Sequence, residues 1–366
     1  MSKRILSAVT AAVLLLSACN SGNTEVRSEA REISPFSNLC NNGELSLSPD
    51  GKAMFTDFTN LNSSYICTRP NCPHNDPKTC SAYGMGHCPF IYGDKIYYFE
   101  VETEVADDGT IFDTTYICTA DLDGNNRQRI YTADHVSACD YTAMYLAEGK
   151  LYFSMARFGY SEYGSTGYDE MLLCRYNFDS NTLETLRSFG TNWSSGIFIA
   201  GVFDGSVYII YSYSEEEIVV TPETMGQMGA IDFEYVNLRY DIEAEEFFDW
   251  DKGDFSDISG GCYITEEDGV LVFLDQAGRT ATVNLESVKE IDGVVNGIAF
   301  SAYYGFCIDL YGGGTYRLSV YDDTGEKRYE VVDFVEDRYI LRCMDYSSGE
   351  TTYSAMTKDE LIKEKI

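Results

Sequence analysis

The chain has 366 residues, with 59 acidic against 26 basic side chains and a formal net charge of −33. Such acidity repels nucleic acid and anionic lipid headgroups, and no basic stripe offsets it, which excludes nucleic-acid-binding proteins. Hydrophobic residues make up 44% of the chain and aromatic residues 14%. The chain therefore has enough apolar side chains to bury a substantial core, unlike a disordered acidic protein.

The N-terminus carries an export signal. Two basic residues precede Ile5–Leu16, an apolar run of 12 residues that is too short to span a bilayer as a helix. The run ends in Leu16-Ser17-Ala18-Cys19, which resembles the lipobox of bacterial lipoproteins. This resemblance implies that residues 1–18 are removed as a signal peptide and that Cys19 is lipidated. An ordinary secretory signal with an incidental cysteine is the alternative.

Residues 19–37 are expected to be the lipidated cysteine and a flexible tether, followed by one folded domain at 38–366. The tether is polar and aperiodic, which is typical of a linker. No later segment is long and apolar enough to span a membrane. We therefore expect a protein anchored to the extracytoplasmic face of the cell membrane through acylated Cys19, with its partner in the surrounding medium or wall.

One hairpin pattern recurs along the domain. It is clearest at Phe90–Glu100 (FIYGDKIYYFE), where an apolar pair, a Gly-Asp turn and a strand of aromatic and β-branched residues follow one another. The same pattern returns at 146–155, 202–211 and 265–274, with looser copies at 302–309 and 335–342. Repeated hairpins at this spacing favour a propeller, whose four-stranded blades take about 40–50 residues each.

A second hairpin resembles those of TolB-like β-propellers. It is Tyr116–Tyr131 (YICTADLDGNNRQRIY), with Asp123-Gly124-Asn125 at the turn. Weaker copies lie at 174–186, 238–250 and 318–331. The resemblance implies an all-β propeller of antiparallel four-stranded sheets with about seven blades, while six or eight fit the same pattern. The expected blades are 38–86, 87–134, 135–191, 192–253, 254–292, 293–334 and 335–366. The last is short, so we expect a strand near Gly43–Ser48 to complete it.

The most specific local feature is Cys67-x4-Cys72-x-His74-x5-Cys80, followed by His87-Cys88. Thiolates and imidazole together suit four-coordinate zinc. The expected ligands of a structural zinc ion are Cys67, Cys72, His74 and Cys80, with Cys88 or His87 as substitutes. In an exported protein, disulfides among Cys67, Cys72, Cys80 and Cys88 are the usual alternative, and unpaired thiols are the third. A similar run in TolB-like lipoproteins of anaerobic Gram-positive bacteria implies no chemistry.

Catalytic motifs are sparse. The chain has no GxSxG elbow, HExxH or P-loop. His135, the only histidine outside the cluster, is expected in a turn rather than as a general base. The run Asp121-x-Asp123-Gly124-x-Asn126 mimics the start of a calcium loop but lacks the distant glutamate. We therefore expect a hairpin turn there, no catalytic residues, and no cofactor besides the structural zinc.

Two insertions, Phe158–Asp169 and Ser214–Asp232, are each expected to lengthen a hairpin and to provide a surface that binds a partner, or else to be solvated outer loops without a role. Two functions fit this organisation. One is a binding or scaffold module that presents a propeller face to an extracellular protein, peptide or glycan. The other is a secreted glycosidase or lyase with carboxylates at the propeller channel. The sequence offers no acid/base pair, so binding is favoured.

Overall fold

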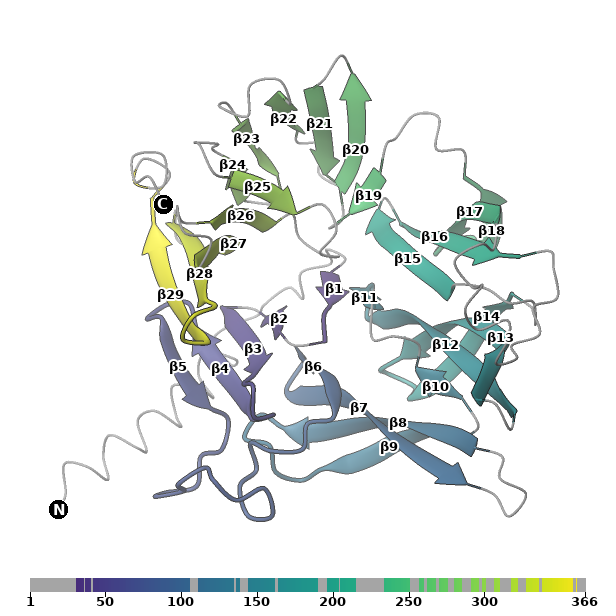
Figure 1. The fold of residues 1–366 in the computed structure, drawn as a ribbon, viewed down its shortest axis with the longest axis horizontal. Coiled ribbons are helices and arrows are strands. Elements are labelled where there is room, and N and C mark those ends of the chain that lie inside the picture. Colours follow the sequence, from purple (N-terminus) through teal and green to yellow (C-terminus); the bar gives the residue numbers. More distant parts are fainter. Residues whose placement is uncertain are drawn as a thin grey trace. The chain divides into compact units, whose positions relative to one another are not determined.

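The structure is a computed structural model, and it describes most of the chain from residue 31 to residue 357 (Figure 1). The described residues are 31–35, 37–40, 42–105, 111–134, 136–138, 144–161, 164–189, 196–203, 205–214, 234–250, the strands β19–β29 between 257 and 356, the turn at 346–349, and residues 357 and 360. The expected signal peptide, Cys19, most of the expected tether and His135 lie outside them. So does the second insertion beyond Ser214.

The described part of the chain forms 29 strands in six sheets, and every pairing with an assigned register is antiparallel. The strands of each sheet follow one another in the chain, with β1 (Arg31–Ile33) as the exception because it joins β11 of the third sheet. Sheets built from consecutive antiparallel strands are the blades of propeller folds. The predicted fold class is confirmed.

The first three sheets lie in one compact unit, mainly residues 33–198. Its first sheet is β2 (Ser37–Cys40), β3 (Gly43–Leu47), β4 (Ala53–Asp57) and β5 (Asn62–Tyr65). The second is β6 (His87–Tyr92), β7 (Lys95–Val105), β8 (Ile111–Asp121) and β9 (Gln128–Ala133). The third is β10 (Ser137–Ala138), β11 (Met144–Ala147), β12 (Lys150–Ser161), β13 (Gly164–Asn177) and β14 (Thr182–Ser188).

Three further sheets complete the described chain, and the last two lie in a second compact unit, mainly residues 237–366. The fourth sheet is β15 (Gly196–Phe203), β16 (Ser206–Tyr213), β17 (Glu234–Asp241) and β18 (Glu246–Asp249). The fifth is β19 (Asp257–Ser259), β20 (Cys262–Glu267), β21 (Val270–Asp275), β22 (Thr280–Asn284), β23 (Ile291–Val295) and β24 (Ile298–Phe300). The sixth is β25 (Phe306–Asp309), β26 (Arg317–Tyr321), β27 (Lys327–Val335), β28 (Arg338–Asp345) and β29 (Glu350–Met356).

The number of sheets in the described chain is six, one fewer than the favoured count and within the expected range. The expected boundary at 334/335 falls inside β27, which pairs with β28 as a hairpin. The last expected blade and the part of the one before it from Phe306 onwards therefore form one sheet, while β24 belongs to the fifth sheet. The strand at Gly43–Leu47 does not complete the last blade. It is β3, and it pairs with β2 and β4 in the first sheet.

The turns after β4, β13, β17 and β28 share one structure, and two of them lie in the hairpin copies predicted at 174–186 and 238–250. An Asp or Asn at the end of the strand accepts a hydrogen bond from the backbone N–H two residues later, which stabilises the turn. The residues are Asp57, Asn177, Asp241 and Asp345. The fourth residue after each has a positive φ, between 52° and 72°. The turn after β8 contains a similar bond, from Asn125 N to Asp123 Oδ1, which confirms the predicted hairpin turn there.

The first insertion extends a sheet. Strands β12 and β13 run through most of it, with Ser161 opposite Gly164, so Phe158–Asp169 lengthens the hairpin as predicted. Among the described residues, no helix is long and apolar enough to cross a membrane.

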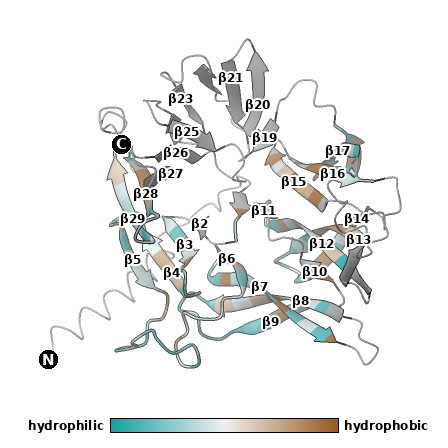
Figure 2. Cartoon of the chain, viewed as in Figure 1, coloured by the Kyte–Doolittle hydropathy of each residue, from teal (hydrophilic) through white to brown (hydrophobic). Residues whose placement is uncertain are grey.

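Two apolar clusters form the core of the first unit, and brown and teal bands mark the alternation of apolar and polar residues along its strands (Figure 2). One cluster packs the second sheet on the third and includes Phe90, Phe99 and Phe153. The other packs the first sheet on the second, through Leu45 and Tyr98 among others. This second apolar cluster also contains Cys67 and Cys80, the first and last predicted ligands in the sequence. The segment between them is therefore attached to the core at both of its ends.

Candidate metal centre

The candidate metal centre lies on the connection between β5 and β6, residues 66–86, which joins the first sheet to the second. The connection contains no strand, and its backbone reverses repeatedly. Cys72 N donates to Arg69 O at 3.2 Å, and Cys80 N donates to Asp76 O at 2.9 Å. Each of these turns ends on a cysteine of the cluster. The local folding therefore returns the chain twice towards Cys67.

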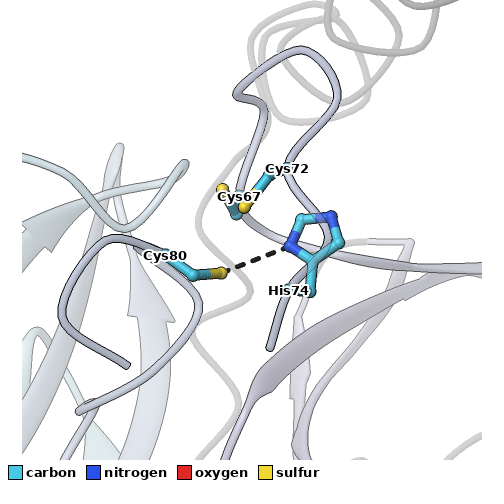
Figure 3. A group of neighbouring side chains, drawn as sticks. All are labelled: Cys67, Cys72, His74 and Cys80. Carbon is cyan, nitrogen blue, oxygen red and sulfur yellow. Dashed lines mark hydrogen bonds between the residues drawn. The ribbon is translucent and has the colours of Figure 1, made fainter. Parts of the chain in front are cut away.

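The structure brings all four predicted ligands together (Figure 3). The sulfur atoms of Cys67, Cys72 and Cys80 and a ring nitrogen of His74 all lie within 4.8 Å of one another. His74 Nδ1 is 3.2 Å from Cys80 Sγ. Zinc bonds of about 2.0–2.3 Å in a tetrahedron put ligand atoms roughly 3.5–4 Å apart. Small shifts of side chains are enough to complete four-coordinate geometry.

Burial divides the ligands into two pairs. Cys67 and Cys80 are 7% and 4% exposed and belong to the core, whereas Cys72 and His74 are half-buried. On the outer side, Arg69 Nη2 donates to Cys72 Sγ at 3.2 Å and to Thr79 Oγ1 at 3.4 Å. Three thiolates around Zn²⁺ would leave one excess negative charge, which the guanidinium of Arg69, beside Cys72 Sγ, would offset.

The thiols of the cluster differ in acidity. Burial acts to raise the pKa of Cys67, but hydrogen bonds from Ser81 and from the backbone amides of Arg69 and Ser81 outweigh it and lower the pKa to about 7. Burial raises the pKa of Cys80 to about 11, and the neighbouring Cys72 and Cys67 add to the rise. Zinc binds thiolates, so metal binding would have to displace the proton of Cys80.

Two tyrosines, Tyr65 and Tyr83, contact His74. The Tyr65 ring lies 4.8 Å from the imidazole, centroid to centroid, and Tyr83 Oη donates to the His74 carbonyl at 3.3 Å. Lys52 Nζ lies over both rings, 4.9 Å from the Tyr65 centroid and 5.4 Å from that of Tyr83, and forms an ion pair with Asp50. His74 itself has a positive φ of 52°. These contacts fix the ring that faces Cys80.

The predicted substitutes are not part of the cluster. Cys88 is fully buried in the core between the second and third sheets, where burial raises its pKa to about 12. His87 is the first residue of β6 and is exposed. Within the described residues, no disulfide joins Cys67, Cys72 or Cys80, which are free thiols.

Sequence reasoning did not find the residues that surround the ligands. Arg69 lies between Cys67 and Cys72 in the sequence. A basic residue within a run of cysteines is the one local sequence feature that could have indicated its contact with the thiols. Tyr65 and Lys52 precede the cluster in the chain, and their place beside His74 depends on the pairing of β4 with β5. No spacing along the chain indicates that contact.

Comparisons with known proteins add only weak likenesses. No protein-family model and no curated protein matches the chain. A mutant of the Synechocystis apocarotenoid oxygenase is 10% identical over 90% of this chain and 70% of that one, with a TM-score of 0.36. The oligogalacturonate lyase of Vibrio parahaemolyticus is 12% identical over 92% and 83%, with a TM-score of 0.34. TolB from Acinetobacter baumannii is 12% identical over 86% and 68%, with a TM-score of 0.26. At TM-scores below 0.5, these likenesses do not bear on the activity of this chain.

Proposed function

We propose that this chain is an exported, lipid-anchored protein whose 66–86 connection binds one structural zinc ion. The observation that carries the metal assignment is the convergence of Cys67, Cys72, His74 and Cys80, whose ligand atoms all lie within 4.8 Å of one another. Sulfur and imidazole ligands select zinc over magnesium or calcium, which prefer oxygen. Four protein ligands fill a tetrahedron and leave no open position for substrate, so the role is structural.

We further propose that the protein works as a binding or scaffold module for an extracellular protein, peptide or glycan. The lipobox at Cys19 and the polar tether support a place at the membrane surface. The β12–β13 hairpin supports a binding role, because its extended end is rich in Tyr, Gly and Ser, the composition of adaptable recognition surfaces. Because a sheet already orders this hairpin, binding a partner would lose little conformational entropy.

The metal assignment is tested by the metal content of the full chain, purified in detergent without added metal or chelator. Elemental analysis should find one zinc per chain. A Cys72→Ala variant should lose it, because Cys72 supplies one of four ligands, while Cys40→Ala should keep it, because Cys40 is a half-buried thiol outside the cluster. Full chain that is folded and contains no zinc, and takes up none when it is added, contradicts the proposed function.

A further inference from the structure

Ser81, which follows the ligand Cys80, is held by a turn of the neighbouring sheet. Its Oγ donates to the backbone O of Asp123 at 2.6 Å, and its own carbonyl accepts a hydrogen bond from Arg127 Nη2 at 2.8 Å. Both partners belong to the turn between β8 and β9, residues 122–127. A Cβ at Gly124 would lie 2.1 Å from Ser81 O, so the turn approaches as closely as a glycine allows.

Arg127 fastens the end of the connection to this turn. Besides Ser81 O, its guanidinium donates to the carbonyls of Tyr83 and Gly84, the latter at 2.8 Å, while its Nε donates to Gly124 O at 3.1 Å. One planar side chain thus bonds three carbonyls of the connection and one of its own turn. Only arginine has enough donors in a fixed fork to do so.

The segment that Arg127 holds contacts the ligands directly. Ser81 is bonded covalently to the predicted ligand Cys80, so any shift of Ser81 moves Cys80. Tyr83 donates to the His74 carbonyl. A displacement of residues 81–84 therefore changes the separation of Cys67 and Cys80 and releases a contact of His74. The turn at 122–127 therefore holds residues that directly adjoin or contact two of the four predicted ligands, Cys80 and His74.

We propose that Arg127 is a positioning residue of the metal centre: by holding residues 81–84, the β8–β9 turn sets Cys67 and Cys80 at metal-binding distance. The inference rests on the proposed function and deepens it. Metal binding is then linked to the docking of the β8–β9 turn on the connection. Such linkage is reciprocal, so each process raises the equilibrium constant of the other by the same factor. Loss of such an outer-shell partner typically weakens metal binding by about 10–100-fold.

The test compares metal affinities of full-length variants. Co²⁺ titration, followed by the sulfur-to-cobalt charge-transfer absorption, and Zn²⁺ competition against a chromophoric chelator each give a dissociation constant. Arg127→Ala should raise both constants about 10–100-fold. Arg127→Lys keeps the positive charge but loses the planar set of guanidinium donors, so we expect it to bind the metal with intermediate affinity. It also provides the measurement if Arg127→Ala does not fold. The control Arg157→Ala removes an exposed guanidinium that pairs with Glu170 in the third sheet, and its constants should be unchanged.

A second readout separates positioning from general stability. If Arg127 only stabilised the fold, its loss would lower the melting temperature equally with and without metal, and the dissociation constants would not move. The inference predicts that the rise in melting temperature on adding Zn²⁺ is smaller in Arg127→Ala than in the wild type. Wild-type dissociation constants in both Arg127 variants overturn this inference alone. A wild-type chain that binds neither Co²⁺ nor Zn²⁺ overturns the proposed function and this inference with it.

Discussion

Cys80→Ser should abolish stoichiometric zinc binding and remove the stabilisation that the metal provides. Cys80 is 4% exposed and is one of the two ligands fixed in the core. Serine keeps the size of the side chain but does not supply a soft thiolate. A ligand that binds only the folded state stabilises it by about 4 kcal/mol when its free concentration is 1,000 times the dissociation constant. We therefore expect a clear fall in the melting temperature measured by calorimetry in zinc-containing buffer.

Cys118→Ser is the matched control, because Cys118 is a thiol of the same core cluster, 1% exposed, that is not a predicted ligand. Both variants bear the cost of a buried hydroxyl. A chelator should lower the melting temperature of the wild type and of Cys118→Ser and should leave Cys80→Ser unchanged. A reductant alone should have no effect on any of the three. Melting that responds to reductant and not to chelator would instead support disulfides.

Cys19→Ala should eliminate acylation of the protein. The thiol of Cys19 is the atom that the lipobox resemblance assigns to the lipid, and alanine offers no attachment point. Wild-type protein expressed with labelled fatty acid should carry the label and begin, after processing, at residue 19. The variant should carry none, and it should be secreted into the medium or remain as the uncleaved precursor.

Cys40→Ala is the control for this change, since it removes another thiol near the start of the folded domain and leaves the lipobox intact. It should be labelled, cleaved and found in the membrane fraction like the wild type. A Cys19→Ala protein that is still labelled and still processed to the same mass would refute the lipoprotein assignment while leaving the metal centre unaffected.

The local sequence predicts the hairpins well. Phe90–Glu100 forms the β6–β7 hairpin, with Tyr92 opposite Lys95 and a positive φ of 62° at Gly93. The TolB-like run at Tyr116–Tyr131 is the β8–β9 hairpin, with Ile117 opposite Tyr131. Alternating aromatic residues and turn residues suffice here because both strands and their turn are contiguous in the chain.

The grouping of hairpins into sheets is harder to predict, because the hydrophobic pattern is the same on either side of a blade boundary. Only the pairing of β27 with β28 places Phe334 and Tyr339 in one sheet. The convergence of Cys67, Cys72, His74 and Cys80 was predictable for the opposite reason: these residues are close together in the sequence and their side chains have a specific chemistry. Arg127 was not, since its contact with Ser81 joins residues 46 positions apart through the packing of two sheets.

X-ray absorption at the zinc edge of the purified full chain measures the atoms that surround the proposed zinc ion. We expect a shell of three sulfur atoms at about 2.3 Å and one nitrogen at about 2.0–2.1 Å from the metal. A shell of oxygen and nitrogen alone would contradict it, as would a chain without zinc whose Cys67, Cys72 and Cys80 are found in disulfides by mass spectrometry.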